Sequence, residues 1–169
     1  ALGLAAGLPV PVMVEELKVF PGLEHRCQLV AESKGVRFIN DSKATNPGAA
    51  MAALDGLAQG KNIVLIAGGQ GKGADFMELA ERASDTCKAA VLIGEDAPQL
   101  AAVLAPRLPV YRALSLEGAV SVAAGLARRN DVVLLSPACA SFDMFDGFAQ
   151  RGEAFAAAVA ALIAGREHE

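Results

Sequence analysis

Residues 63–94, IVLIAGGQGKGADFMELAERASDTCKAAVLIG, decide the fold of this chain. The runs 63–67 and 89–93 are continuously apolar, and residues 76–83 between them carry apolar side chains at helical spacing. Strands that are apolar on both faces are typical of a parallel sheet, whose strands are connected by helices that cover the sheet. The stretch therefore predicts a β-α-β unit, and such units have right-handed crossovers.

The same alternation extends in both directions from this stretch. Toward the C-terminus it predicts helices over 97–104, 116–129 and 148–164 and strands over 110–113 and 132–135. Toward the N-terminus it predicts a hairpin of 27–31 and 36–39, a helix over 49–57 and two short helices within 1–8 and 12–20. We therefore predict an α/β fold: a mostly parallel sheet with helices on both faces, a small hairpin and an N-terminal helical segment. The pattern leaves the order of the strands open.

Composition limits the function of the chain. Its 169 residues suit one domain, and 53% hydrophobic with 20% charged residues excludes a disordered chain. The net charge of -4 argues against nucleic acid as a partner. The longest uncharged run, residues 1–14, is too short to span a membrane. Three widely spaced cysteines predict neither a disulfide framework nor a metal site, and they favour the reducing cytoplasm.

Three polar loops follow predicted strands. They are 41–46 (DSKATN), 68–75 (GGQGKGAD) and 136–143 (SPACASFD). Ligands of open parallel sheets bind beyond the carboxyl ends of the strands, so we expect the three loops to share one edge of the sheet. Lys43 and Lys72 are cations suited to carboxylate or phosphate oxygens, and the glycines allow close approach of backbone N–H groups. The loops therefore predict a ligand that is anionic or has two anionic ends.

Each loop taken alone is also compatible with an ordinary strand-to-helix turn. Residues 68–73 depart from the dinucleotide spacing G-x-G-x-x-G, and Lys72 is not followed by the Ser or Thr of a phosphate-binding P-loop. No histidine lies near Ser136 or Ser141 to activate a serine nucleophile. A Rossmann-type dinucleotide-binding module and a non-catalytic anion-binding domain therefore remain alternatives to an enzyme domain.

Four motifs taken together resemble one family. They are FPGLEHRCQ (20–28), FINDSKATN (38–46), GGQGKGADF (68–76) and LSPACASFD (135–143), in this order. They are similar to motifs of the Mur ligases, in the variant that adds D-glutamate to UDP-N-acetylmuramoyl-L-alanine. The resemblance implies that residues 20–169 form the C-terminal, Rossmann-like, amino-acid-binding domain. Residues 1–19 would then be the last stretch of the central ATPase domain.

The resemblance also implies an activity. ATP would activate the carboxylate of UDP-N-acetylmuramoyl-L-alanine as an acyl phosphate, which the amine of D-glutamate attacks to form an amide in peptidoglycan precursor synthesis. The cofactors would be ATP and Mg²⁺, with the Mg²⁺ ligands and the phosphate loop outside this chain. We therefore expect the chain alone to be inactive. The implied partners are the other domains of the same protein, with no nucleic acid or membrane, in a cytoplasmic monomer.

Site residues follow from the same resemblance. Lys43 would act in catalysis near the transferring phosphoryl group and the acyl carbon, with Arg26 toward the nucleotide phosphates and Asp41 toward the ribose. One carboxylate of D-glutamate would bind Thr45 and Lys72, and the other would bind Ser141 with the backbone near Phe142 and Phe148. The sequence departs from the family at Gln70, where many relatives carry an acidic residue, and at Asp146-Gly147, in place of a Lys-Asn-like pair. These departures affect details of the amino-acid site.

Overall fold

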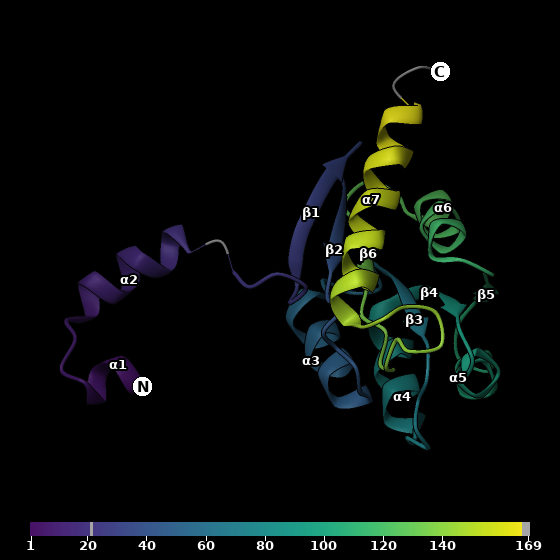
Figure 1. Cartoon of the computed structure of the whole chain (residues 1–169), viewed down its shortest axis with the longest axis horizontal. Coiled ribbons are helices and arrows are strands. Elements are labelled where there is room, and N and C mark those ends of the chain that lie inside the picture. Colours follow the sequence, from purple (N-terminus) through teal and green to yellow (C-terminus); the bar gives the residue numbers. More distant parts are fainter. Residues whose placement is uncertain (21, 167–169) are drawn as a thin grey trace.

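The computed structural model describes residues 1–20 and 22–166, and a six-stranded sheet forms its centre (Figure 1). The strand order is β1-β2-β6-β3-β4-β5. The strands are β1 (Gln28–Ser33), β2 (Val36–Asn40), β3 (Ile63–Gly68), β4 (Cys87–Ile93), β5 (Val110–Arg112) and β6 (Val132–Leu135). Only β1 runs antiparallel, as the partner of β2 in a hairpin, and the other pairs are parallel. The predicted mostly parallel sheet and the hairpin are confirmed.

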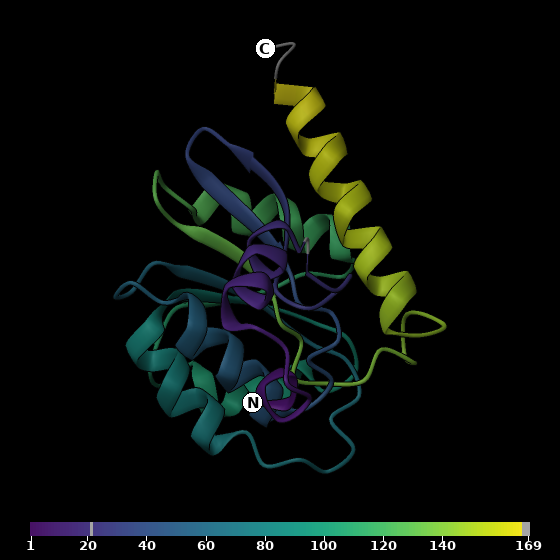
Figure 2. The ribbon, with the colours of Figure 1, turned by 90° about the vertical axis from the view of Figure 1, so that its left-hand side faces the viewer.

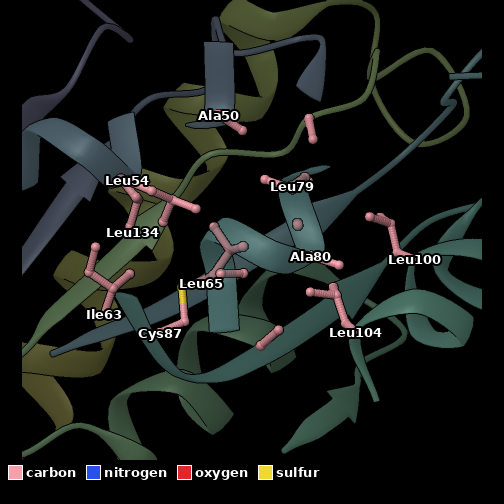
Figure 3. Packing of buried hydrophobic residues seen from close by; sticks show 14 of the residues in the cluster. Ala50, Leu54, Ile63, Leu65, Leu79, Ala80, Cys87, Leu100, Leu104 and Leu134 are labelled. Atoms are coloured by element: carbon pink, nitrogen blue, oxygen red, sulfur yellow. The ribbon is translucent and has the colours of Figure 1, made fainter. Parts of the chain in front are cut away.

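Helices cover both faces of the sheet, as predicted. The hydrophobic cluster on one face contains α3 (Pro47–Leu57), α4 (Met77–Thr86) and α5 (Ala97–Leu104), and the cluster on the other contains α6 (Leu116–Leu126) and α7 (Phe148–Arg166). Figure 2 shows α7 on one side of the sheet and α3 and α4 on the other. Every residue of β3 is buried because its alternate side chains enter the two clusters, Leu65 with Leu54 and Leu79 (Figure 3) and Val64 on the opposite face. Covering of both faces is the reason for the continuous apolar runs in the sequence.

Two predicted helix ends are wrong by three residues, and the first is that of α4, which ends at Thr86 and not at residue 83. Helix α6 ends at Leu126 and not at residue 129, because the backbone of Ala127 is extended and the Asp131 side chain accepts a hydrogen bond from the backbone that follows. The Arg128 N–H donates to the Asp131 carboxylate at 2.6 Å, and Asn130 has a left-handed backbone, φ 73°. Lys88 of β4 pairs with the same carboxylate at 2.6 Å. This turn leads directly into β6, which begins at Val132.

The N-terminal segment forms the two short helices expected, α1 (Leu2–Ala5) and α2 (Val10–Val19). In Figure 1 they lie to the left of the sheet, apart from its strands. Neither helix has a buried residue, and large apolar side chains such as Leu17 (70% exposed) and Val19 (76% exposed) face solvent. Among the described residues, no helix is both long and apolar enough to cross a membrane.

Candidate anion-binding site at the carboxyl edge of the sheet

The three polar loops that follow β2, β3 and β6 meet at one edge of the sheet, as expected. Gln70 and Ala140 exchange two backbone hydrogen bonds of 2.9 Å, which join the β3 loop to the β6 loop. The Asp41 N–H donates to the Leu135 carbonyl at 2.8 Å, which joins the β2 loop to the end of β6. Because β6 lies between β2 and β3, its loop is the one that contacts both others.

A pocket of about 240 Å³ opens between these loops. Its lining contains every residue that the sequence assigned to catalysis and to D-glutamate, together with Ala140. The lining residues are Lys43, Thr45, Lys72, Ala140, Ser141, Phe142 and Phe148. The structure therefore brings the predicted group together, from the three loops and the start of α7, up to 105 residues apart in the chain (43 to 148).

Two ammonium groups of the pocket lie over aromatic rings. The Lys43 Nζ is 3.8 Å from the centre of the Phe148 ring, and the Lys72 Nζ is 5.6 Å from the centre of the Phe142 ring. Such a contact contributes about 0.5–1 kcal/mol at an exposed site, and it holds a flexible side chain in place. Together with the hydroxyls of Thr45 and Ser141, the pocket offers two cations and two hydrogen-bond donors, a set that suits a ligand with two carboxylates.

Local structure fixes the Thr45 side of the pocket. Asn46 is the N-cap of α3: its side chain accepts a hydrogen bond from the Ala49 N–H at 3.0 Å. Pro47 follows in the first turn of the helix, where its missing N–H costs nothing. Thr45 thus lies immediately before a well-capped helix N-terminus, which carries a partial positive charge that favours anions.

Arg26 and Asp41 lie in a neighbouring hollow of about 260 Å³, which shares Lys43 with the pocket. Small side chains such as Ala52 and Ala53 also line it. Asp41 is only 7% exposed, and its two oxygens accept hydrogen bonds from the Ser136 hydroxyl at 2.8 Å and the Cys27 N–H at 3.2 Å. Each carboxylate oxygen keeps capacity for a second donor.

Burial disfavours the charged form of two acidic groups in this hollow. Burial raises the pKa of the Asp41 carboxyl above its usual value, against the hydrogen bonds from Ser136 and Cys27 and the charge of Arg26, which lower it. Burial and the charge of Asp41 raise the pKa of the Cys27 thiol to about 11. The thiol therefore stays protonated at neutral pH and is a poor nucleophile.

Arg151 of α7, which no sequence motif indicated, holds the edge together through hydrogen bonds. This side chain is 1% exposed, and no acidic group pairs with it among the described residues. Its guanidinium donates to the Ser42 hydroxyl (3.0 Å), the Ser42 carbonyl (2.9 Å) and the Cys139 carbonyl (3.1 Å). Burial lowers the pKa of Arg151 to about 10, so it remains charged at neutral pH. A signal existed: Phe148, Arg151 and Phe155 lie at helical spacing on the face of α7 that points inward.

The residues at which the sequence departs from the Mur ligase pattern lie outside the pocket lining. The Gln70 amide donates to Glu95 at 3.0 Å. Asp146 and Gln150 bond to each other at the start of α7, with the Asp146 N–H donating to the Gln150 side chain at 2.6 Å. Both departures therefore change neighbours of the pocket and leave its lining intact.

Comparison with known proteins shows the class of this domain. Residues 25–139 match the family model described as "Mur ligase, glutamate ligase domain". The chain therefore belongs to the Mur ligase family. UDP-N-acetylmuramoylalanine--D-glutamate ligase of Legionella pneumophila is 56% identical over 165 residues, which cover 96% of this chain and 37% of that enzyme. The enzyme of the same name from Pseudomonas aeruginosa is 54% identical with the same coverage. This chain thus spans about 37% of the length of these relatives.

A solved structure confirms the fold. The MurF ligase of Thermotoga maritima, determined in complex with ADP, matches 98% of this chain and 36% of its own chain with a TM-score of 0.68. The two sequences are 18% identical, so this likeness concerns the arrangement of strands and helices.

Proposed function

We propose that this chain is the C-terminal, amino-acid-binding domain of a cytoplasmic, monomeric ligase that uses ATP to join D-glutamate to UDP-N-acetylmuramoyl-L-alanine. The identity of 56% to an enzyme named for this product supports the proposal. Residues 20–169 form the domain, and residues 1–19 end the central ATPase domain. The exposed apolar side chains of α1 and α2 support this division, because a preceding domain would bury them.

The observation that carries the proposal is the composition of the 240 Å³ pocket. D-Glutamate brings two carboxylates and one amine, and the pocket brings two ammonium groups and two hydroxyls. Thr45 and Lys72 hold one carboxylate, while Ser141 and the backbone near Phe142 and Phe148 hold the other. The amine is then left free to react at the open side of the pocket.

Lys43 stands between the pocket and the hollow of Arg26 and Asp41, since it lines both. An acyl phosphate and the tetrahedral species formed from it carry negative charge, which a fixed ammonium group stabilises. ATP supplies the phosphoryl group of this reaction. Arg26 directs its guanidinium to the phosphates, and Asp41 accepts a ribose hydroxyl with its remaining lone pairs. The donor chemistry of the hollow fits this part of a nucleotide, although its volume lies below the roughly 300–1,000 Å³ of complete small-molecule sites.

Magnesium has no set of ligands in the described part of the chain. No group of three or more His, Cys, Asp or Glu side chains lies close enough there to hold a metal ion. The Mg²⁺ ligands are proposed, as the resemblance to the Mur ligases implies, to belong to the rest of the protein. The chain alone is then expected to bind D-glutamate without catalysing the ligation.

A chimera tests the proposal. This chain would replace the matching 37% of the Legionella enzyme, and the release of ADP that depends on D-glutamate would be measured. We expect an active chimera, in which Thr45→Ala raises the KM for D-glutamate by about tenfold and changes the KM for ATP little, because one carboxylate contact is lost. An active chimera whose KM for D-glutamate is insensitive to Thr45→Ala would contradict the pocket assignment.

A further inference from the structure

Asp96, from the loop between β4 and α5, holds the Lys72 loop from outside the pocket. Its Oδ2 accepts a hydrogen bond from the Gly71 N–H at 2.6 Å, and its own N–H donates to the Gly69 carbonyl at 2.9 Å. The Gln99 amide donates to Asp96 Oδ1 at 2.6 Å, so each carboxylate oxygen has its own partner. Asp96 therefore fixes the chain at Gly69 and Gly71, on both sides of Gln70, and Gly71 directly precedes Lys72.

Lys72 needs such support, because its backbone is left-handed. Its φ is 53°, a conformation in which Cβ comes close to the backbone, and the position is not a glycine. The Lys72 ammonium lines the pocket, and its location depends on the direction in which this strained backbone points the side chain. Gly71 cannot be replaced by a larger anchor, since a Cβ there would lie 2.7 Å from the Phe76 ring.

Among the described residues, the hydrogen bond from Gln99 of α5 is the one that the Asp96 carboxylate accepts from outside the Lys72 loop. Asp96 occupies the N-cap position of α5, yet its side chain makes no capping hydrogen bond to that helix. It does not line the pocket, and the loop that carries it supplies none of the pocket residues. The partners of its side chain are the Gly71 N–H and Gln99.

We propose that Asp96 is a positioning residue of the anion pocket, whose carboxylate keeps Lys72 in the left-handed conformation that places its ammonium group at the ligand. The inference rests on the proposed function for the identity of the ligand as D-glutamate. The neighbouring Glu95 N–H donates to Asp143 at 2.8 Å, and Asp143 follows Ser141 and Phe142 on the opposite wall. Residues 94–96 therefore form a brace between the two walls of the pocket.

Three variants of the chain test the role of Asp96. Asp96→Ala removes the acceptor of the Gly71 N–H, whereas Asp96→Asn keeps an oxygen at the same place. Asp75→Ala is the matched control. Asp75 lies on the same loop as Lys72, but its carboxylate accepts a hydrogen bond from the Met77 N–H at 2.9 Å at the start of α4. NMR would record the HN–Hα coupling and backbone order of Lys72, which report its φ without any ligand, and the Kd for D-glutamate.

We expect Asp96→Ala to lower the order of Lys72 and to shift its coupling away from that of a left-handed residue. It should also weaken D-glutamate binding by about fivefold or more, because a displaced cation loses its contact. Asp96→Asn and Asp75→Ala should stay within about twofold of the unchanged chain. An unchanged Lys72 coupling and order in Asp96→Ala would overturn the proposal.

The outcomes separate this inference from the proposed function. If the unchanged chain and the chimera both fail to bind D-glutamate, the proposed function fails, while the Lys72 backbone still decides the role of Asp96. If Asp96→Ala does not fold, the test is made by NMR on the unchanged chain. The 2.6 Å hydrogen bond from the Gly71 N–H to Asp96 predicts a Gly71 amide proton that resonates far downfield and exchanges slowly. An exposed, fast-exchanging Gly71 amide would then overturn the proposal.

Discussion

The centre of the sheet and a polar cluster at its carboxyl edge are both buried, but different forces hold them. All six residues of β3 are buried and carry apolar side chains or none, so burial of apolar surface stabilises the centre without fixing directions. At the edge, Asp41, Ser42 and Arg151 are buried and polar, and each is held by hydrogen bonds that do fix directions. Apolar burial at the centre stabilises the fold, whereas the buried polar groups of the edge cost some stability and fix the shape of the pocket.

The largest expected loss of stability belongs to the centre. Leu65→Ala removes a fully buried side chain between α3 and α4 and should lower the free energy of unfolding by about 3 kcal/mol. Urea denaturation would measure this loss. Amide shifts of Thr45 and Ser141 should remain as in the unchanged chain, and a large shift at these residues would remove the distinction between centre and edge.

A change at the edge should cost less stability but alter the pocket more. Arg151→Met leaves the Ser42 and Cys139 carbonyls without donors and should destabilise by about 2 kcal/mol, because the unpaired buried acceptors cost more than is gained by removing a buried charge. The Lys43 amide should shift strongly in the NMR spectrum. Arg151→Lys, which keeps the charge and reaches fewer acceptors, should give an intermediate result. A fully stable Arg151→Met variant with an unperturbed Lys43 would contradict the role of the guanidinium.

The dependence of stability on pH tests the burial of the Asp41 carboxyl at the edge. Burial raises the pKa of Asp41 in the folded chain, so the folded state holds this proton more tightly than the unfolded state does. Stability contributed by this group is therefore present at low pH and falls as the pH rises from the unfolded value of 3.8 through the folded pKa. The difference in unfolding free energy between the unchanged chain and Asp41→Asn should follow this course. A difference that grows in favour of the unchanged chain with rising pH would contradict it.

The smallest effect is expected outside both regions, on α2. Leu17 is 70% exposed, and Leu17→Ser should change the free energy of unfolding by less than about 0.5 kcal/mol. The same variant in the chimera should be more costly, since we propose that the preceding domain covers this helix. Equal, small effects in the chain and in the chimera would count against that contact.

The sequence predicted the elements of the sheet well because the central strands β3, β4 and β6 are buried on both faces and the helices α3 to α7 each bury one face, which are local patterns. The pocket residues were predicted because their motifs, such as DSKATN at 41–46, are contiguous. The position of β6 between β2 and β3 was not predictable, since strand order depends on pairings remote in the chain. The role of Arg151 was not predicted for the same reason, since its hydrogen bonds with Ser42 join residues 109 positions apart in the chain. The end of α6 was missed because Asp131 competes for the backbone there.

The most direct test is an NMR titration of the labelled chain, and then of the chimera, with D-glutamate and L-glutamate. Binding near millimolar affinity, about -4 kcal/mol, is measurable by this method. Saturable shifts at Thr45, Lys72 and Ser141 with D-glutamate, weaker with L-glutamate, are the result that the proposed pocket predicts. Shifts confined to other parts of the surface, or no localised shifts in either protein, would contradict it.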